Sequence, residues 1–332
     1  MSTIIIAEAG VNHNGDMLLA KEMIEKAAEA GADIVKFQTF VPELVISKFA
    51  SKADYQKNTT GTDESQLDMV RRYFLSNDEH YELVSHAKKC GIEFLSTPFD
   101  LVSVDFLKEL DLSYWKIPSG EITNLPYLIA VAKTGKPVIM SSGMCTMEEV
   151  KSSLNVLKEN GSGEIIVLHC NTEYPTPFED ANLSAIITLR DELGVRTGYS
   201  DHTPGIEAAI AATALGAVVL EKHFTLDRNM DGPDHKASIE PDELIAMVQA
   251  VRNVERAMGT GIKSPSPSER KNIDIARKSI VARVDIQKGE VLTEDNIIVK
   301  RPGDGISPMK WFDVLGTKAI RDFSEDEKIE IV

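Results

Sequence analysis

The sequence predicts an α/β fold, a (β/α)8 or TIM barrel followed by a small β-rich domain. Eight short apolar runs alternate with amphipathic stretches, a pattern typical of parallel strands joined by helices. No GxGxxG motif follows the first run, which argues against the competing doubly wound open sheet. We expect the strands at residues 4–7, 33–35, 92–96, 114–117, 137–140, 165–168, 195–199 and 217–220.

The first strand–helix unit shows the pattern most clearly. Apolar residues at helical spacing follow a polar turn and predict a helix over 17–30, with Asp16 as its N-cap and Gly31 as its stop. A long polar excursion, 41–77, then separates the second and third strands. Long loops in compact domains are usually functional or disordered, so we expect a lid or substrate-binding loop here.

The barrel pattern stops after the helical stretch that begins near Pro241. Residues 261–276 are rich in Ser, Pro and charge, which is typical of a linker. Beyond them, short β runs at 279–282 and 297–301 alternate with glycine-containing turns. We therefore predict a barrel over 1–260, a linker over 261–276 and a β-rich domain over 277–332.

Composition excludes several classes of protein. The 332 residues carry a formal net charge of -16, which disfavours sequence-independent binding to nucleic acid or to an anionic membrane. The three cysteines lie far apart and share no metal-binding spacing, which favours reduced thiols in a cytoplasm. The sequence shows no signal peptide and no run of transmembrane length. We therefore expect a cytoplasmic protein with no nucleic-acid or membrane partner.

Every predicted strand is followed by polar residues that suit chemistry. In barrel enzymes the active site lies at the C-terminal ends of the strands. Lys36 and Lys116 follow the second and fourth strands, and ammonium groups beside hydroxyls suit a phosphate or carboxylate. Two alternatives remain for these lysines: ion pairs with Glu8 or Glu121, or a Schiff base of the kind that barrel aldolases form. The hydroxyls expected beside them are Ser119, Ser141 and Ser200.

Two histidines stand at the ends of neighbouring strands. His202 follows the seventh strand and His223 ends the eighth, so their imidazoles can share a divalent ion. Only two such ligands suit an open site completed by water and substrate, which favours Mn²⁺ or Mg²⁺ over a closed structural zinc site. His80 and His86 lie in a helical stretch, and we expect them on the surface.

Carboxylates complete the predicted site. Glu8 ends the first strand and Glu121 follows the fourth, and both are candidates for acid–base catalysis. Asp234 lies in a Gly-Pro loop after the eighth strand, where it could bind hydroxyls of a polar substrate.

Nine ordered motifs resemble the sialic acid synthase family, and the C-terminal segment resembles that family's antifreeze-like (SAF) domain through VKRPGDGI (299–306). The resemblance covers essentially the whole chain. The barrel motifs are AEAGVNHNGD (7–16), VKFQTF (35–40), STPFD (96–100), KIPSGE (116–121), SSGM (141–144), HCNTEYPTP (169–177), GYSDHT (198–203), EKHFTLD (221–227) and GPDHKASIEP (232–241).

The resemblance implies a condensation of phosphoenolpyruvate with an N-acetylated mannosamine-type sugar, with release of phosphate. Glu8 and Glu121 would transfer protons, and Lys116 would compensate phosphate charge together with Lys36. His202 and His223 would hold the metal, with Mn²⁺ as the expected ion and Mg²⁺ or Co²⁺ as alternatives. The donor would be held by Lys36, Thr97, Lys116, Ser119, Ser141 and Ser200, and the acceptor would be contacted by Glu8, Glu121, Tyr174 and Asp234.

The family pattern also implies a partner subunit. Arg301 in the small domain would reach the acceptor in the barrel of a second copy, so the active site would form in a domain-swapped homodimer.

The acceptor sugar is the least determined feature. We expect N-acetylmannosamine, which would make the chain an N-acetylneuraminate synthase. Thr172 stands where some such members have Asn, however, and the run 235–238 is similar to that of synthases acting on 2,4-diacetamido sugars. The alternative is therefore an N,N'-diacetyllegionaminate synthase with 2,4-diacetamido-2,4,6-trideoxymannose as acceptor. A Schiff-base sialic acid aldolase and a sugar-binding module in the C-terminal domain are further alternatives.

Overall fold

The computed structural model describes residues 2–52, 56–57, 60 and 64–331. The chain divides into two compact units, 1–259 and 260–332, and each is described by itself. The segment predicted as a linker contains two short helices with mostly exposed side chains, α12 (Pro267–Arg270) and α13 (Ile273–Ala276).

The first unit is built on one sheet of eight parallel strands. Its strand order is β3-β2-β1-β8-β7-β6-β5-β4, and the two end strands contact each other, so the sheet is a nearly closed barrel. The predicted (β/α)8 fold is confirmed. The strands are β1 (Ile4–Gly10), β2 (Ile34–Thr39), β3 (Glu93–Pro98), β4 (Trp115–Ile117), β5 (Val138–Ser141), β6 (Ile165–Cys170), β7 (Arg196–Asp201) and β8 (Val219–His223).

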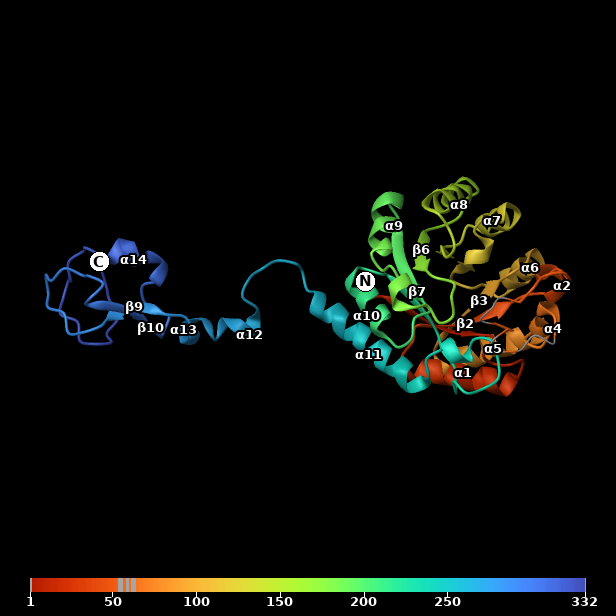
Figure 1. Cartoon of the computed structure of the whole chain (residues 1–332), viewed down its shortest axis with the longest axis horizontal. Helices are drawn as coiled ribbons and strands as arrows, with labels where there is room; N and C mark the ends of the chain where they lie inside the picture. Colours follow the sequence, from red (N-terminus) through yellow and green to blue (C-terminus); the bar gives the residue numbers. More distant parts are fainter. Residues whose placement is uncertain (1, 53–55, 58–59, 61–63, 332) are drawn as a thin grey trace. The chain divides into compact units, whose positions relative to one another are not determined.

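Helices surround these strands in the first unit (Figure 1). The apolar stripe of each main helix packs on the sheet and forms one continuous core with it. Asp16 caps the first helix as predicted, since its carboxylate accepts from the backbone N–H of Leu18 at 2.7 Å. The main helices are α1 (Met17–Glu29), α5 (Asn77–Cys90), α6 (Leu101–Glu109), α7 (Leu125–Ala132), α8 (Met147–Glu159), α9 (Ala185–Leu193), α10 (Glu207–Ala214) and α11 (Pro241–Met258).

The excursion after β2 carries two short helices, α2 (Pro42–Val45) and α4 (Gln66–Arg71). An ion pair of 2.8 Å between Arg71 Nε and Glu43 Oε1 joins them. The rest of the predicted lid lies partly outside the described residues, at 53–55, 58–59 and 61–63. Three short 3₁₀ helices follow other strands: η1 (Ser119–Glu121), η2 (Phe178–Asp180) and η3 (His235–Ala237).

One surface prediction was wrong. His80 is fully buried, because its face of α5 turns toward the sheet. Its Nε2 lies 2.8 Å from Thr39 Oγ1, and its Nδ1 lies 2.9 Å from the carbonyl oxygen of Ser76. A histidine with both ring nitrogens in hydrogen bonds can lie in a core without an unsatisfied polar group. His86, by contrast, is partly exposed as expected.

The second unit has its own small core. Strands β9 (Ser279–Ala282) and β10 (Ile297–Lys300) pair antiparallel, and isolated bridges such as Ile286 with Phe323 extend the β structure. The segment η4 (Pro308–Lys310) and α14 (Trp311–Val314) complete the unit. None of the helices in the described part of the chain combines the length and apolar character that crossing a membrane requires.

Candidate active site

A cavity of about 310 Å³ lies at the C-terminal ends of the barrel strands. Side chains from all eight strands line it, because parallel strands of a barrel all end at the same face. The predicted site residues that line the cavity are Glu8, Lys36, Thr97, Lys116, Ser119, Ser141, Tyr174, Ser200, His202, His223 and Asp234.

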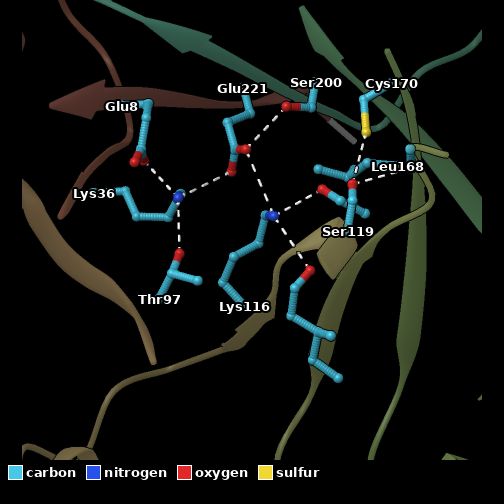
Figure 2. Close-up of polar contacts among 12 residues, drawn as sticks. Glu8, Lys36, Thr97, Lys116, Ser119, Leu168, Cys170, Ser200 and Glu221 are labelled. Carbon is cyan, nitrogen blue, oxygen red and sulfur yellow. Dashed lines mark hydrogen bonds and ion pairs between the residues drawn. The ribbon is translucent and has the colours of Figure 1, made fainter. Parts of the chain in front are cut away.

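Lys36 lies among buried oxygen atoms. Its Nζ is 2.5 Å from Glu8 Oε2 and 2.9 Å from Thr97 Oγ1 (Figure 2). Glu8 and Lys36 are register partners on β1 and β2, which explains why their side chains meet. The second carboxylate near this ammonium group is Glu221, whose Oε2 lies 3.6 Å away.

Lys116 contacts the other carboxylate oxygen of Glu221. Its Nζ donates to Ser141 Oγ at 2.7 Å and lies 3.6 Å from Glu221 Oε1. The same carboxylate oxygen accepts from Ser200 Oγ at 3.0 Å. Figure 2 shows Glu221 between the two ammonium groups. Ion pairing, one of the alternatives for these lysines, is therefore present with Glu8 as expected, but the second partner is Glu221 rather than Glu121.

The two buried carboxyl groups have opposite pKa shifts. Burial is the largest influence on Glu8, and it outweighs the ammonium group of Lys36 and raises the pKa of Glu8 to about 7. Burial would also raise the pKa of Glu221. Here Lys116 and Lys36 outweigh it and lower that pKa to about 2. Burial lowers the pKa of Lys116.

A short turn places Ser119 beside the ammonium groups. The backbone N–H of Gly143 donates to Ser119 Oγ at 3.0 Å, and Cys170 Sγ lies 3.2 Å from the same hydroxyl. Gly143 has no room for a side chain, since a Cβ there would lie 2.8 Å from Ser119 Oγ and 2.7 Å from Thr172 Cγ2. The close approach of the Gly143 backbone therefore holds the Ser119 hydroxyl in position.

The structure brings the two predicted metal ligands together. The ring centroids of His202 and His223 are 5.4 Å apart, and the ring of Tyr174 lies 4.1 Å from that of His202. The Nδ1–H of His202 donates to the carbonyl oxygen of Asn171 at 2.5 Å, which leaves the lone pair on Nε2.

These histidines fit a divalent cation. Burial lowers the pKa of His202 to about 4 and that of His223 well below its ordinary value, so both imidazoles are neutral near pH 7. A neutral imidazole is the form that binds a metal. The Nδ1 atom of His223 is buried without a hydrogen-bond partner among the described residues, so this donor atom is available to a cation.

A second cluster of metal-type donors lies elsewhere. Glu25 on α1 and His86 and Cys90 on α5 bring their ligand atoms within 4.8 Å of one another. None of the three lines the cavity. His86 Nε2 already pairs with Glu25 Oε1 at 2.9 Å, which accounts for its position.

Two predicted site residues are not placed at the cavity. Glu121 accepts from the side-chain amide of Asn124 at 2.5 Å and does not line the cavity, so its catalytic role stays a prediction. Arg301 belongs to the second unit, where its Nε donates to the carbonyl oxygen of Ala276 at 3.0 Å. Its contact with an acceptor also stays a prediction.

Sequence reasoning did not select Glu221 as a site residue. A signal was available, because successive side chains of a strand point to opposite faces. Glu221 and His223 are two residues apart on β8, so they point the same way. Ser200 and His202 have the same spacing at the end of β7. The choice of His223 as a ligand therefore already implied that Glu221 faces the cavity.

Comparison with known proteins matches both units. The NeuB family model matches residues 23–263, and the SAF domain model matches 277–330. The N,N'-diacetyllegionaminic acid synthase of Campylobacter jejuni is 56% identical over 98% of this chain and 98% of its own length. The enzyme of that name from Legionella pneumophila is 44% identical over 98% of this chain and 92% of its own length.

A solved structure is also similar. The N-acetylneuraminic acid (sialic acid) synthetase of Leptospira borgpetersenii is 36% identical, with a TM-score of 0.72 over 82% of this chain and 90% of the other. The chain is therefore a member of the NeuB family of sialic acid and related sugar acid synthases, and it carries a SAF domain.

Proposed function

We propose that the cavity condenses phosphoenolpyruvate with the open-chain aldehyde of an N-acetylated mannosamine-type sugar and releases phosphate by C–O cleavage. One observation carries the proposal: two buried ammonium groups share the cavity with two neutral histidines and two carboxyl groups of opposite pKa shift. This combination can bind an anionic donor, hold a cation and transfer protons.

The donor binds at the ammonium groups. Lys36 and Lys116 neutralise its phosphate and carboxylate charges, and the hydroxyls of Ser119, Ser141 and Ser200 donate hydrogen bonds to the same oxygens, as Thr97 does from β3. In the structure these lysines are paired with Glu8 and Glu221. The donor anion therefore competes with internal carboxylates for the two cations.

His202 and His223 hold the divalent ion, with Mn²⁺ as the expected one. When bound, such an ion supplies Lewis acidity that polarises the aldehyde oxygen of the acceptor. His202 is held for this task by its hydrogen bond to Asn171 and by the ring of Tyr174. Tyr174 and Asp234 line the same cavity and bind polar groups of the acceptor.

The bond changes balance without a further reactant. C3 of phosphoenolpyruvate forms a bond to the aldehyde carbon, and positive charge develops at C2. Water adds to C2, and phosphate leaves from the resulting tetrahedral carbon as the C2–O bond breaks. As the C2 carbonyl group forms, the added water gives up both of its protons: one ends on the former aldehyde oxygen and the other on the departing phosphate. Glu8, with a pKa of about 7, is the group that moves these protons, and the lysines neutralise the leaving phosphate.

The acceptor proposed here differs from the one first expected. The sequence favoured N-acetylmannosamine, but relatives at 56% and 44% identity are N,N'-diacetyllegionaminic acid synthases. We therefore propose 2,4-diacetamido-2,4,6-trideoxymannose as the acceptor. N-Acetylmannosamine remains the second candidate, since the solved sialic acid synthetase is 36% identical.

The decisive experiment measures phosphate release and product mass. Purified full-length protein with Mn²⁺ and phosphoenolpyruvate is offered the diacetamido sugar, N-acetylmannosamine or N-acetylmannosamine 6-phosphate. We expect release with the first and a nine-carbon sugar acid of matching mass. No release above background with any acceptor would exclude the proposal.

The Schiff-base alternative has one supporting observation, the lowered pKa of Lys116. Borohydride reduction in the presence of pyruvate tests it, because an adduct at Lys116 or Lys36 would reveal an aldolase. We expect no adduct.

The small domain's part is tested by complementation. We propose that Arg301 serves the barrel of a partner subunit in a swapped homodimer. When the Arg301→Ala and His202→Asn proteins are unfolded, mixed and refolded together, the mixture should recover part of the activity that each variant lacks by itself. Absence of any recovery, together with a monomeric mass in solution, would contradict the swapped site.

A further inference from the structure

The cavity has an apolar wall in addition to its charged strand ends. The wall is formed by Phe40, Val45, Ile46, Met69, Val70 and Phe99. All but Phe99 come from the end of β2 and the excursion after it, including α2 and α4. The proposed donor and metal do not use this surface, because neither a phosphate nor a cation gains from contact with hydrocarbon.

The wall is packed before any substrate binds. Met69 is 1% exposed and Phe40 is 6% exposed, and both belong to a local apolar cluster that includes Phe99. The rings of Phe40 and Phe99 meet edge to face, with centroids 6.4 Å apart. Val45 and Val70 are only partly buried, so their methyl groups are available to a ligand in the cavity.

No lysine or arginine belongs to the apolar wall or to the rest of the excursion among the described residues that line the cavity. Among the described residues that line the cavity, the only lysines or arginines are Lys36 and Lys116, at the strand ends. Arg72 lies nearby but lines a neighbouring cavity, its guanidinium is 5.9 Å from the ring centroid of Tyr73, and it pairs with Glu64 at 2.5 Å. A phosphate on the acceptor would therefore meet the apolar wall, where Gln56 is a polar residue of the excursion among the described lining residues, and would have no cation beside it there.

We infer that the apolar wall is the subsite that selects the acceptor, by taking a deoxy carbon and an acetamido methyl group at the end of the sugar remote from its aldehyde. This inference rests on the proposed function. The aldehyde must lie near the histidines and the donor, so the remote end of the sugar points away from the strand ends. A methyl group there gains contact, whereas a hydroxyl loses its hydrogen bonds to water without replacement.

The test replaces wall methyl groups by hydroxyls of equal size. Val45→Thr and Val70→Thr keep the shape of the wall and add polarity, and Val84→Thr on α5 is the matched control, since Val84 is partly buried and does not line the cavity. The full chain with Mn²⁺ is assayed for kcat/KM with the diacetamido-trideoxy sugar, with N-acetylmannosamine and with N-acetylmannosamine 6-phosphate. Melting temperatures show whether each variant is folded. Val45→Ala, which removes methyl groups without adding a hydroxyl, is a second variant that keeps an effect on specificity distinct from misfolding.

We expect the wild type to prefer the deoxy acceptor by about tenfold or more, and each wall variant to lose about tenfold in that preference. KM for phosphoenolpyruvate should stay within about twofold, and Val84→Thr should behave as wild type. Equal losses with both acceptors, unchanged preference, or fastest turnover of the 6-phosphate would overturn the inference while the condensation stands. No phosphate release with any acceptor would overturn the proposed function, and the inference with it.

Discussion

Glu8 and Glu221 are two buried carboxyl groups that share the ammonium group of Lys36, yet their pKa values are shifted in opposite directions. The difference arises because Glu221 also faces Lys116, whereas Glu8 has Lys36 as its one close cation among the described residues. One group therefore stays ionised near pH 7 while the other can gain and lose a proton. Pairs of this kind divide electrostatic and acid–base roles.

Replacing Glu8 by Gln should remove proton transfer while keeping the size of the side chain. We expect kcat to fall by about 100- to 10,000-fold, with KM for phosphoenolpyruvate changed much less. Steady-state phosphate release measures both constants. Glu82→Gln on the surface of α5, paired with Lys21, is the control. Activity of Glu8→Gln within about tenfold of wild type would remove Glu8 from the proton transfers.

Glu221→Gln should act on stability and anion binding together. The change leaves Lys36 and Lys116 without the carboxylate between them, and loss of one partner from a buried ion pair costs about 3 kcal/mol of unfolding free energy or more. Inorganic phosphate should restore more stability to this variant than to wild type. Urea unfolding with and without phosphate measures this, with Glu192→Gln, paired with Lys151, as the control.

If phosphate stabilised Glu221→Gln and wild type equally, the two ammonium groups would not form the anion site.

We expect the metal dependence of phosphate release to require His202 and His223. Chelation should abolish phosphate release and Mn²⁺ should restore it, whereas His223→Gln should lose high-affinity Mn²⁺ binding in calorimetry. His86→Gln is the control, because it removes a donor from the other cluster without touching the cavity. Mn²⁺ affinity lost in His86→Gln and kept in His223→Gln would reverse this assignment.

Asp234 should make the protein less stable as pH rises. Burial raises its pKa from 3.8 to about 6, so the folded state holds the proton more tightly than the unfolded chain does. Its stabilising contribution is complete below about pH 3.8 and is lost as pH rises through about 6. Asp234→Asn should therefore raise the unfolding free energy at pH 7 by up to about 3 kcal/mol.

Urea unfolding between pH 4 and pH 8 tests the Asp234 prediction. The gap between Asp234→Asn and wild type should close near pH 4, and Asp105→Asn, at an exposed aspartate, is measured in parallel as the control. The same variant should raise KM for the acceptor if Asp234 binds its hydroxyls. A gap that does not change with pH would contradict the pKa shift.

Gly120 follows Ser119 in the chain and the backbone N–H of Gly143 donates to the Ser119 hydroxyl, so the two glycines offer a matched pair of substitutions. A Cβ at Gly143 would lie 2.8 Å from Ser119 Oγ, whereas a Cβ at Gly120 would meet nothing within 4 Å. Gly143→Ala should displace Ser119 and raise KM for phosphoenolpyruvate about tenfold, equivalent to about 1.4 kcal/mol. Gly120→Ala should leave KM unchanged. Equal effects of the two substitutions would show that the position of Ser119 does not control donor binding.

The sequence by itself determined the barrel and most of the residues that line its cavity. The physical reason is that parallel strands in a barrel end at one face, so residues at strand ends converge wherever the strands are recognised. Lys36, Lys116, His202 and His223 follow this rule, although they are far apart along the chain. The polar–apolar pattern is local information, which a single sequence carries.

Tertiary structure decided which neighbour each side chain meets. Glu121 lies in the short 3₁₀ turn η1 that follows β4, so the alternation of side chains along a strand does not determine where its side chain points. Its carboxylate contacts Asn124 and does not line the cavity. Glu221 stays on its strand and so joins the two lysines. The apolar wall likewise depends on α2 and α4 folding back beside Phe99, a contact between distant segments that no periodicity in the sequence encodes.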